Sequence, residues 1–349
     1  MEKVKKKDVL TALAIGSSRV SVCVAALDRE ACVNLIGLGK SDGRLMGGRG
    51  VFEIDALAKA MRDALKTARE EAGVTCPKTL VSISGGNISI ERSAGMVKVG
   101  QRGGEISRKN VRDAIKMAEA VPIAIEKELI HSIPQDFIVD GQEGIKNPVG
   151  LYGIKLEVKS LLITAHFPFL QNITKCLNLA GTELDNVVFS GIASSKSLSN
   201  EAEGKGVILL ETDNNFTVIS VFFDNVLKGA KVHECCVTSE GALGFLRQKA
   251  DEIRGNNPVS KVILAGNTFV REDFIERVES VFGIPAQMGC LRNIKGSAKD
   301  MYNPAHLTSI GLALYGFEKR RENTGSKKRG FGLIRKLTRR VSGFMDEYF

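Results

Sequence analysis

The chain of 349 residues has no apolar run of 18 residues, and its seven cysteines form no C-x-x-C pair. The first absence excludes a conventional membrane-spanning helix, which needs about 20 predominantly apolar residues. The second argues against a zinc site or a disulfide framework, so we expect a reducing, cytosolic environment. A hydrophobic content of 43% excludes global disorder, and the length predicts about two domains.

Positive charge is concentrated near the C-terminal end of the sequence. The segment from Lys319 to Phe349 holds ten basic and three acidic residues, so it carries +7 of the net charge of +9. The basic character therefore belongs to a tail and not to the body of the protein. This distribution predicts an anionic partner for the tail alone.

The body alternates between strand-like and helix-like segments. A hairpin is predicted over 10–27 and another over 207–223, and each is followed by helical periodicity, at 54–72 and at 239–253. We expect Asp55 to cap the first of these helices and Gly73 to end it, and Ser107 to cap a helix over 107–120. This repeated order indicates two α/β halves that face one another.

The tail divides into a charged segment and a periodic one. Residues 318–329 contain glycine, serine and many charges, which is typical of a flexible linker. Residues 331–349 regain a helical period, with apolar side chains on one face and basic ones mostly on the other, as in an interfacial membrane helix. The residues predicted to bind the membrane are Phe331, Leu333, Ile334, Arg335, Lys336, Leu337, Arg339, Arg340, Val341, Phe344, Met345, Tyr348 and Phe349. A docked helix and nucleic-acid binding are the alternatives for this segment.

One stretch carries a family resemblance. The segment 133–158, IPQDFIVDGQEGIKNPVGLYGIKLEV, resembles the bacterial cell-division protein FtsA family of actin-like membrane adaptors. Residues 12–20, 47–51, 82–85 and 311–316 agree with that family in the same order. Within 133–158 the carboxylates are interpreted as surface or turn residues and not as catalytic groups.

The resemblance implies an α/β, actin-like (ribonuclease-H-like) fold of two halves with an FtsA-type inserted, SHS2-like subdomain. It also implies a shortened second half and a C-terminal amphipathic helix. The corresponding ranges are 8–83 and 165–200 for the first half, 84–164 for the insertion, 201–318 for the second half, 319–330 for a basic linker and 331–349 for the membrane helix.

Actin-like ATPases bind phosphates with two hairpin turns, and the first of these keeps part of the pattern here. Gly16, Ser17 and Ser18 retain the glycine and the hydroxyl groups, but Ala14 stands where the resembled pattern has an aspartate. A methyl group cannot organise Mg²⁺. In the region of the adenosine turn, Gly266 is the one glycine kept.

The second phosphate turn departs further from the pattern. Asp213, Asn214 and Asn215 replace a glycine triplet, and the carboxylate adds negative charge where phosphate must approach. Phe269 could fill space near the adenosine position. Gly16, Ser17, Ser18 and Gly266 are therefore interpreted as a vestigial nucleotide site, with no cofactor, no metal and no enzymatic activity expected.

The second half is also short. Only 20 residues, 242–261, separate Gly241 from Val262, where the resembled family carries a whole subdomain. That subdomain closes over nucleotide and binds the tubulin-like protein FtsZ in the family, so its absence puts the FtsZ contact in question.

We therefore predict a degenerate FtsA-like scaffold on the cytoplasmic face of the plasma membrane, as a peripheral protein. Its expected partners are an anionic membrane, FtsZ or another division protein, and further copies of itself, but not nucleic acid. An ATP-binding actin-like filament protein and an actin-like adaptor of a pilus or secretion platform are the alternatives.

Overall fold

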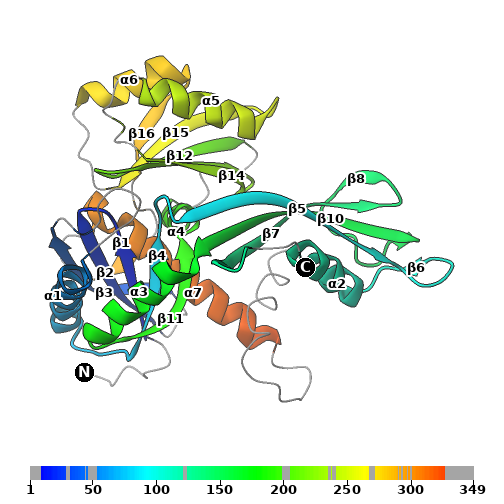
Figure 1. The fold of residues 1–349 in the computed structure, drawn as a ribbon. Coiled ribbons are helices and arrows are strands. Elements are labelled where there is room, and N and C mark those ends of the chain that lie inside the picture. Colours follow the sequence, from blue (N-terminus) through cyan, green and yellow to red (C-terminus); the bar gives the residue numbers. More distant parts are fainter. Residues whose placement is uncertain are drawn as a thin grey trace. The chain divides into compact units, whose positions relative to one another are not determined.

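The computed structural model describes residues 9–326, except 29–31, 44, 46–52, 121–123, 199–204, 235–236, 238–240, 267–271, 290, 292–293, 297 and 299–300. The chain divides into two compact units. One consists of Met1–Ile88 and His166–Phe317, and the other of Ser89–Ala165 together with the segment that begins at Glu318. Figure 1 shows the fold with its elements labelled.

The first unit contains a six-stranded mixed sheet in the order β11-β4-β1-β2-β3-β17. Strands β1, β2 and β3 form an antiparallel meander, while β4 and β11 continue the sheet in parallel on the other side of β1. Their bounds are β1 Val9–Ile15, β2 Arg19–Leu27, β3 Val33–Asp42, β4 Lys78–Ile83, β11 Glu183–Phe189 and β17 Lys295–Gly296. Strands β1 and β4 are almost continuously buried, as expected for neighbouring parallel strands in the interior of a sheet.

Helix α1, Ile54–Ala72, packs beside α3, Phe167–Leu179, and against β3. The approach of α1 to β3 is close: a Cβ atom at Gly39 would lie 2.1 Å from the Ala64 carbonyl oxygen. Gly73 ends α1 in the left-handed conformation, at φ 64°, as predicted. The prediction for the other end is wrong, because the N-cap is Glu53 and Asp55 lies in the first turn, where its charge favours the helix dipole.

A second sheet of the same unit repeats this plan in the order β14-β13-β12-β15-β16. Helices α5 and α6 cover one face of it (Figure 1) and bury a core between helix and sheet. The bounds are β12 Gly206–Thr212, β13 Thr217–Phe223, β14 Val226–His233, α5 Ala242–Arg254, β15 Val259–Gly266, α6 Glu272–Phe282 and β16 Ala286–Met288. Only a turn over 255–258 connects α5 to β15, so the second half is shortened as predicted.

Three further elements complete the first unit. They are α4 Ser190–Ser197, a 3₁₀ helix at Pro304–His306 and, as far as Phe317, α7 Leu307–Ser326. Helix α7 corrects one expectation, because it continues through residues 318–326, which the sequence assigns to a flexible linker. The predicted membrane helix over 331–349 lies outside the described residues. Among those that are described, no helix is long and apolar enough to cross a membrane.

The second unit is a four-stranded sheet in the order β5-β10-β7-β8 with helix α2 packed on one face. Ser107 caps α2 in a capping box with Asn110, as predicted. A two-stranded ribbon of β6 and β9 adjoins it. The bounds are β5 Ile88–Lys98, β6 Gly104–Glu105, α2 Arg108–Glu119, β7 Lys127–Val139, β8 Gln142–Ile145, β9 Tyr152–Gly153 and β10 Lys155–His166.

Acidic side chains in the segment 133–158 organise its turns. The Asp136 carboxylate accepts the backbone N–H of Gly144, and Asp140 accepts the N–H groups of Ile154 and Lys155. Asp140 itself has a positive φ of 51°, which an aspartate tolerates better than most residues. Asp140 is thus a turn residue, as interpreted from the sequence, whereas Asp136 lies within β7 and holds the backbone of β8.

Candidate functional site

The two predicted phosphate turns meet in the first unit. The turn between β1 and β2 holds Ser17, and the turn between β12 and β13 holds Asp213. The backbone N–H of Ser17 donates to Asp213 Oδ2 at 2.8 Å, and the Ser17 hydroxyl donates to Asp213 Oδ1. Both residues are buried. The sequence predicts these as two separate phosphate turns. In the structure they are joined through Asp213, a residue that stands where the resembled family has glycine.

Asp213 also accepts a hydrogen bond within its own turn, from the backbone N–H of Asn214 at 2.7 Å. Burial raises the pKa of the Asp213 carboxyl, while the hydrogen bonds from Ser17 and the nearby charge of Arg19 oppose that rise. Its turn is closed by the Asp213 N–H, which donates to the Phe216 carbonyl at 2.9 Å. The carboxylate therefore has protein donors on both of its oxygen atoms.

A second carboxylate, Glu211, lies two residues earlier at the end of β12. It accepts hydrogen bonds from the hydroxyls of Ser190, at 3.0 Å, and Ser194, at 2.6 Å, both on α4. Burial raises the pKa of Glu211 to about 7, and the neighbouring charge of Asp213 acts in the same direction. The sequence reasoning missed this group, although the serine-rich stretch around Ser194 is a sign of buried hydroxyls.

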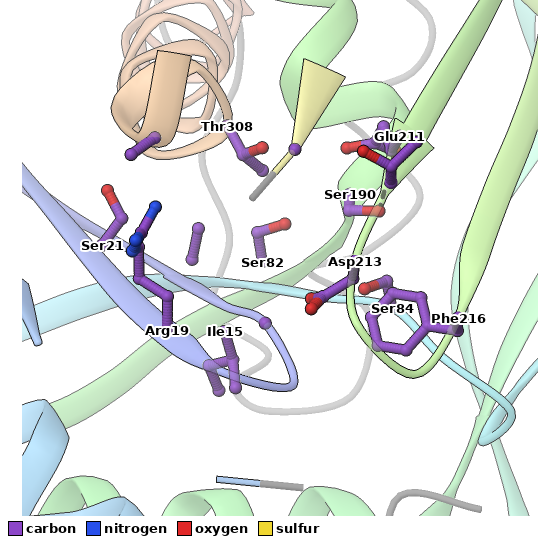
Figure 2. A pocket seen from close by; sticks show the side chains of 15 residues that line it. Ile15, Arg19, Ser21, Ser82, Ser84, Ser190, Glu211, Asp213, Phe216 and Thr308 are labelled. Atoms are coloured by element: carbon purple, nitrogen blue, oxygen red, sulfur yellow. Dashed lines mark hydrogen bonds between the residues drawn. The ribbon is translucent and has the colours of Figure 1, made fainter. Parts of the chain in front are cut away.

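A small cavity with a mixed polar and apolar lining lies between these groups (Figure 2). Its volume is about 50 Å³, room for a few water molecules, whereas small-molecule pockets typically measure about 300–1,000 Å³. Gly16 and Gly266 line it, together with Ala14, Phe216 and Glu211.

The remaining predicted residues have other surroundings. Ser18 is half-buried, and its carbonyl accepts the N–H of Gly43. Gly266 has a φ of 110°, and a Cβ atom there would lie 2.1 Å from the Thr212 carbonyl oxygen, so close strand packing alone requires glycine. Phe269 lies outside the described residues, while Phe216, which sequence reasoning missed, occupies the cavity wall.

These residues do not fit a magnesium nucleotide. The Ala14 methyl group stands at the cavity wall, Asp213 takes the donors of the first turn, and both buried carboxylates repel phosphate. Within the described part of the chain, no three His, Cys, Asp or Glu side chains cluster as metal ligands.

Comparison with known proteins agrees with this architecture. The profile of the SHS2 domain inserted in FtsA matches residues 85–164. Among solved structures, a chain of the PilM–PilN type IV pilus biogenesis complex superposes with a TM-score of 0.65 at 14% identity, covering 88% of this chain and 98% of that one. The ethanolamine utilization protein EutJ from Carboxydothermus hydrogenoformans gives a TM-score of 0.50 at 10% identity. The fold is therefore actin-like with an SHS2 insertion.

Similarity in sequence narrows this class further. The cell division protein FtsA of Escherichia coli K12 is 31% identical over 249 residues, which cover 70% of this chain and 59% of that protein. FtsA of Borreliella burgdorferi is 25% identical over 412 aligned positions, covering 98% of this chain and all of that one. The chain belongs to the FtsA family. The second alignment is longer than the chain, so that relative has residues without a counterpart here.

Proposed function

We propose that this protein is a cell-division scaffold that links components of the division ring to the inner face of the membrane. The observation that carries the proposal is the SHS2 insertion of FtsA within an actin-like fold, found together with relatives named as cell division proteins. No catalytic constellation is needed for this role, and the cleft supplies hydrogen bonds between turns and not a reaction site.

Attachment is assigned to the amphipathic segment 331–349. Basic residues near an anionic leaflet contribute roughly 1 kcal/mol each, and the apolar face adds insertion energy. When several copies associate, several tails bind at once, so a weak monomer contact becomes a firm attachment. Self-association therefore strengthens membrane binding in this proposal.

Protein contacts are assigned to the second unit. Three apolar side chains near its β6–β9 ribbon are exposed: Leu151 by 43%, Tyr152 by 78% and Ile154 by 57%. Exposed apolar groups so close together are typical of protein contacts. FtsZ or another division protein, or a second copy, is the partner that the proposal assigns to this unit.

Liposome flotation tests the proposal. Anionic vesicles are mixed with FtsZ polymer and either the full chain or a chain that ends at Ser326, so that α7 stays intact. Val341→Asp changes the centre of the predicted apolar face, and Ser342→Asp makes the same charge change beside it. We expect flotation of the full chain and of S342D, loss with V341D and with the shortened chain, and FtsZ in the floating fraction only when the protein floats.

Two results would contradict parts of the proposal separately. Equal flotation of the full and shortened chains would show that residues 327–349 do not attach the protein. Flotation of the protein without FtsZ would show that FtsZ is not its partner, and other division proteins would then be tested in the same assay.

A further inference from the structure

The turn between β1 and β2 has hydrogen-bond donors that an anion would satisfy. Ser17 directs both its backbone N–H and its hydroxyl at one carboxylate, and Asn214 adds a third donor from the facing turn. Ser17 is 2% exposed and Asp213 5% exposed, so bulk solvent is largely excluded from this contact. The three donors converge on the two oxygen atoms of one side chain.

A set of donors that converge in this way is typical of a site that binds an oxyanion. Successive backbone N–H groups and hydroxyls in a turn bind phosphate or carboxylate oxygens, because either ligand presents a charged acceptor. Here the acceptor belongs to the chain itself. A phosphate brought to the same donors would have to displace Asp213 and would then face two buried carboxylates.

The contact also spans the first unit. Ser17 and Asp213 are 196 positions apart, and they lie in the β1–β2 and β12–β13 hairpins of two different sheets. Figure 2 shows the Asp213 side chain directed across the cavity from its own turn. A charge-assisted pair of hydrogen bonds in this position connects the two halves through the place where phosphate binds in nucleotide-dependent relatives of this fold.

We propose that Asp213 is a built-in anion, which occupies the phosphate-binding donors of the β1–β2 turn and joins the two halves of the actin-like unit without nucleotide. The chain is thus its own ligand at this site. It follows that removing the carboxylate creates a vacant site for a small oxyanion such as formate. This inference stands apart from membrane attachment, because it concerns only residues of the first unit.

Chemical rescue of a cavity variant tests the inference. The full chain, Asp213→Ala and the nearly isosteric Asp213→Asn are unfolded thermally in sodium formate and in sodium chloride of equal ionic strength. We expect Asp213→Ala to unfold about 5 °C below the parent chain, because a buried charge-assisted contact is lost. Formate should restore at least half of that loss, since it binds only the folded state.

The asparagine variant is the matched control. It keeps the volume of the side chain but removes the charge, so it should be destabilised without responding to formate. Neither formate, inorganic phosphate nor Mg²⁺–ATP should shift the unfolding temperature of the parent chain. Three results would overturn the inference: no loss in Asp213→Ala, no difference between formate and chloride, or a rise of several degrees in the parent chain with Mg²⁺–ATP.

If Asp213→Ala does not fold, a second measurement tests the same contact. Ser17→Ala, Asp213→Asn and their combination form a double-mutant cycle. The inference requires that the double variant loses less unfolding temperature than the two single losses combined, because both changes weaken the same hydrogen bond, from the Ser17 hydroxyl to the Asp213 carboxylate. Additive losses would show that the two residues act independently and would refute the bridge.

Discussion

Replacing Glu211 by glutamine should change how stability depends on pH. Burial raises the pKa of this carboxyl from 4.5 to about 7 in the folded protein. The folded state therefore holds the proton more tightly than the unfolded state between these values. The stability of the parent chain must accordingly fall as the pH rises through this window, which is the reverse of the usual behaviour of a paired carboxylate.

The magnitude follows from the same two values. One pKa unit corresponds to about 1.4 kcal/mol, so the full loss amounts to roughly 3 kcal/mol, of which about 2–3 kcal/mol falls between pH 5 and pH 8. Glu211→Gln has no proton to lose and can still accept one hydrogen bond from the Ser190 or Ser194 hydroxyl. The free energy of unfolding of the variant, relative to the parent, should rise by that amount over the range.

Urea denaturation at pH 5 and pH 8 measures this difference. The matched control is Glu70→Gln on the exposed face of α1, where solvent screens the charge and the parent pH dependence should persist. Parallel pH dependence in the parent chain and in Glu211→Gln, within about 0.5 kcal/mol, would refute the argument from burial.

Two further predictions concern the second unit. A Cβ atom at Gly95 would lie 2.2 Å from a backbone oxygen of α2, so Gly95→Ala should cost about 1–3 kcal/mol in urea denaturation, whereas Gly104→Ala, with open space around it, should cost little. Asp140→Ala removes the acceptor of the Ile154 and Lys155 N–H groups and should cost about 1–3 kcal/mol in the same measurement, more than Asp140→Asn, which keeps one oxygen. If Gly95→Ala and Gly104→Ala lowered the free energy of unfolding equally, the close approach at Gly95 would be contradicted. If Asp140→Ala and Asp140→Asn lowered it equally, the role of Asp140 as an acceptor would be contradicted.

Local signals made much of the fold predictable. Gly73 and Ser107 mark a helix end and a helix start because left-handed backbone and N-cap hydrogen bonds depend on neighbouring residues only. The actin-like fold class with its insertion was predictable because the segment 133–158 preserves a family pattern, and the comparisons confirm it.

Predictions that depended on charge alone were less successful. The segment 318–329 has the composition of a linker, yet α7 continues to Ser326, because a helix already formed is extended at little cost by lysine, arginine and glutamate. The expected cap at Asp55 is wrong for a different reason: the helix begins earlier, after Glu53, which makes no side-chain cap hydrogen bond, and Asp55 then lies in the first turn.

The sequence predicted the effect of Asp213 on phosphate binding but not its contact with Ser17. The charge of Asp213 already argues against phosphate in the sequence, but its pairing with Ser17 depends on how two hairpins are brought together. The same holds for Glu211 and the α4 hydroxyls. Long-range contacts of this kind follow from packing of whole sheets, which local pattern does not specify.

The Asp213 bridge supplies the acceptor that the buried donors of the cleft need, and the shortened second half fits this arrangement. Two turns with donors directed into a common cleft need an anion between them, since buried N–H and hydroxyl groups without acceptors are costly. A bound nucleotide would have to be held and enclosed, but the chain passes from α5 to β15 through the short turn over 255–258. A carboxylate tethered to β12 needs no enclosure and incurs no loss of translational freedom on binding. If Asp213 is the built-in anion, the contact between the two turns needs no nucleotide, and we expect assembly to depend on the concentration of the protein and its partners and not on a nucleotide cycle.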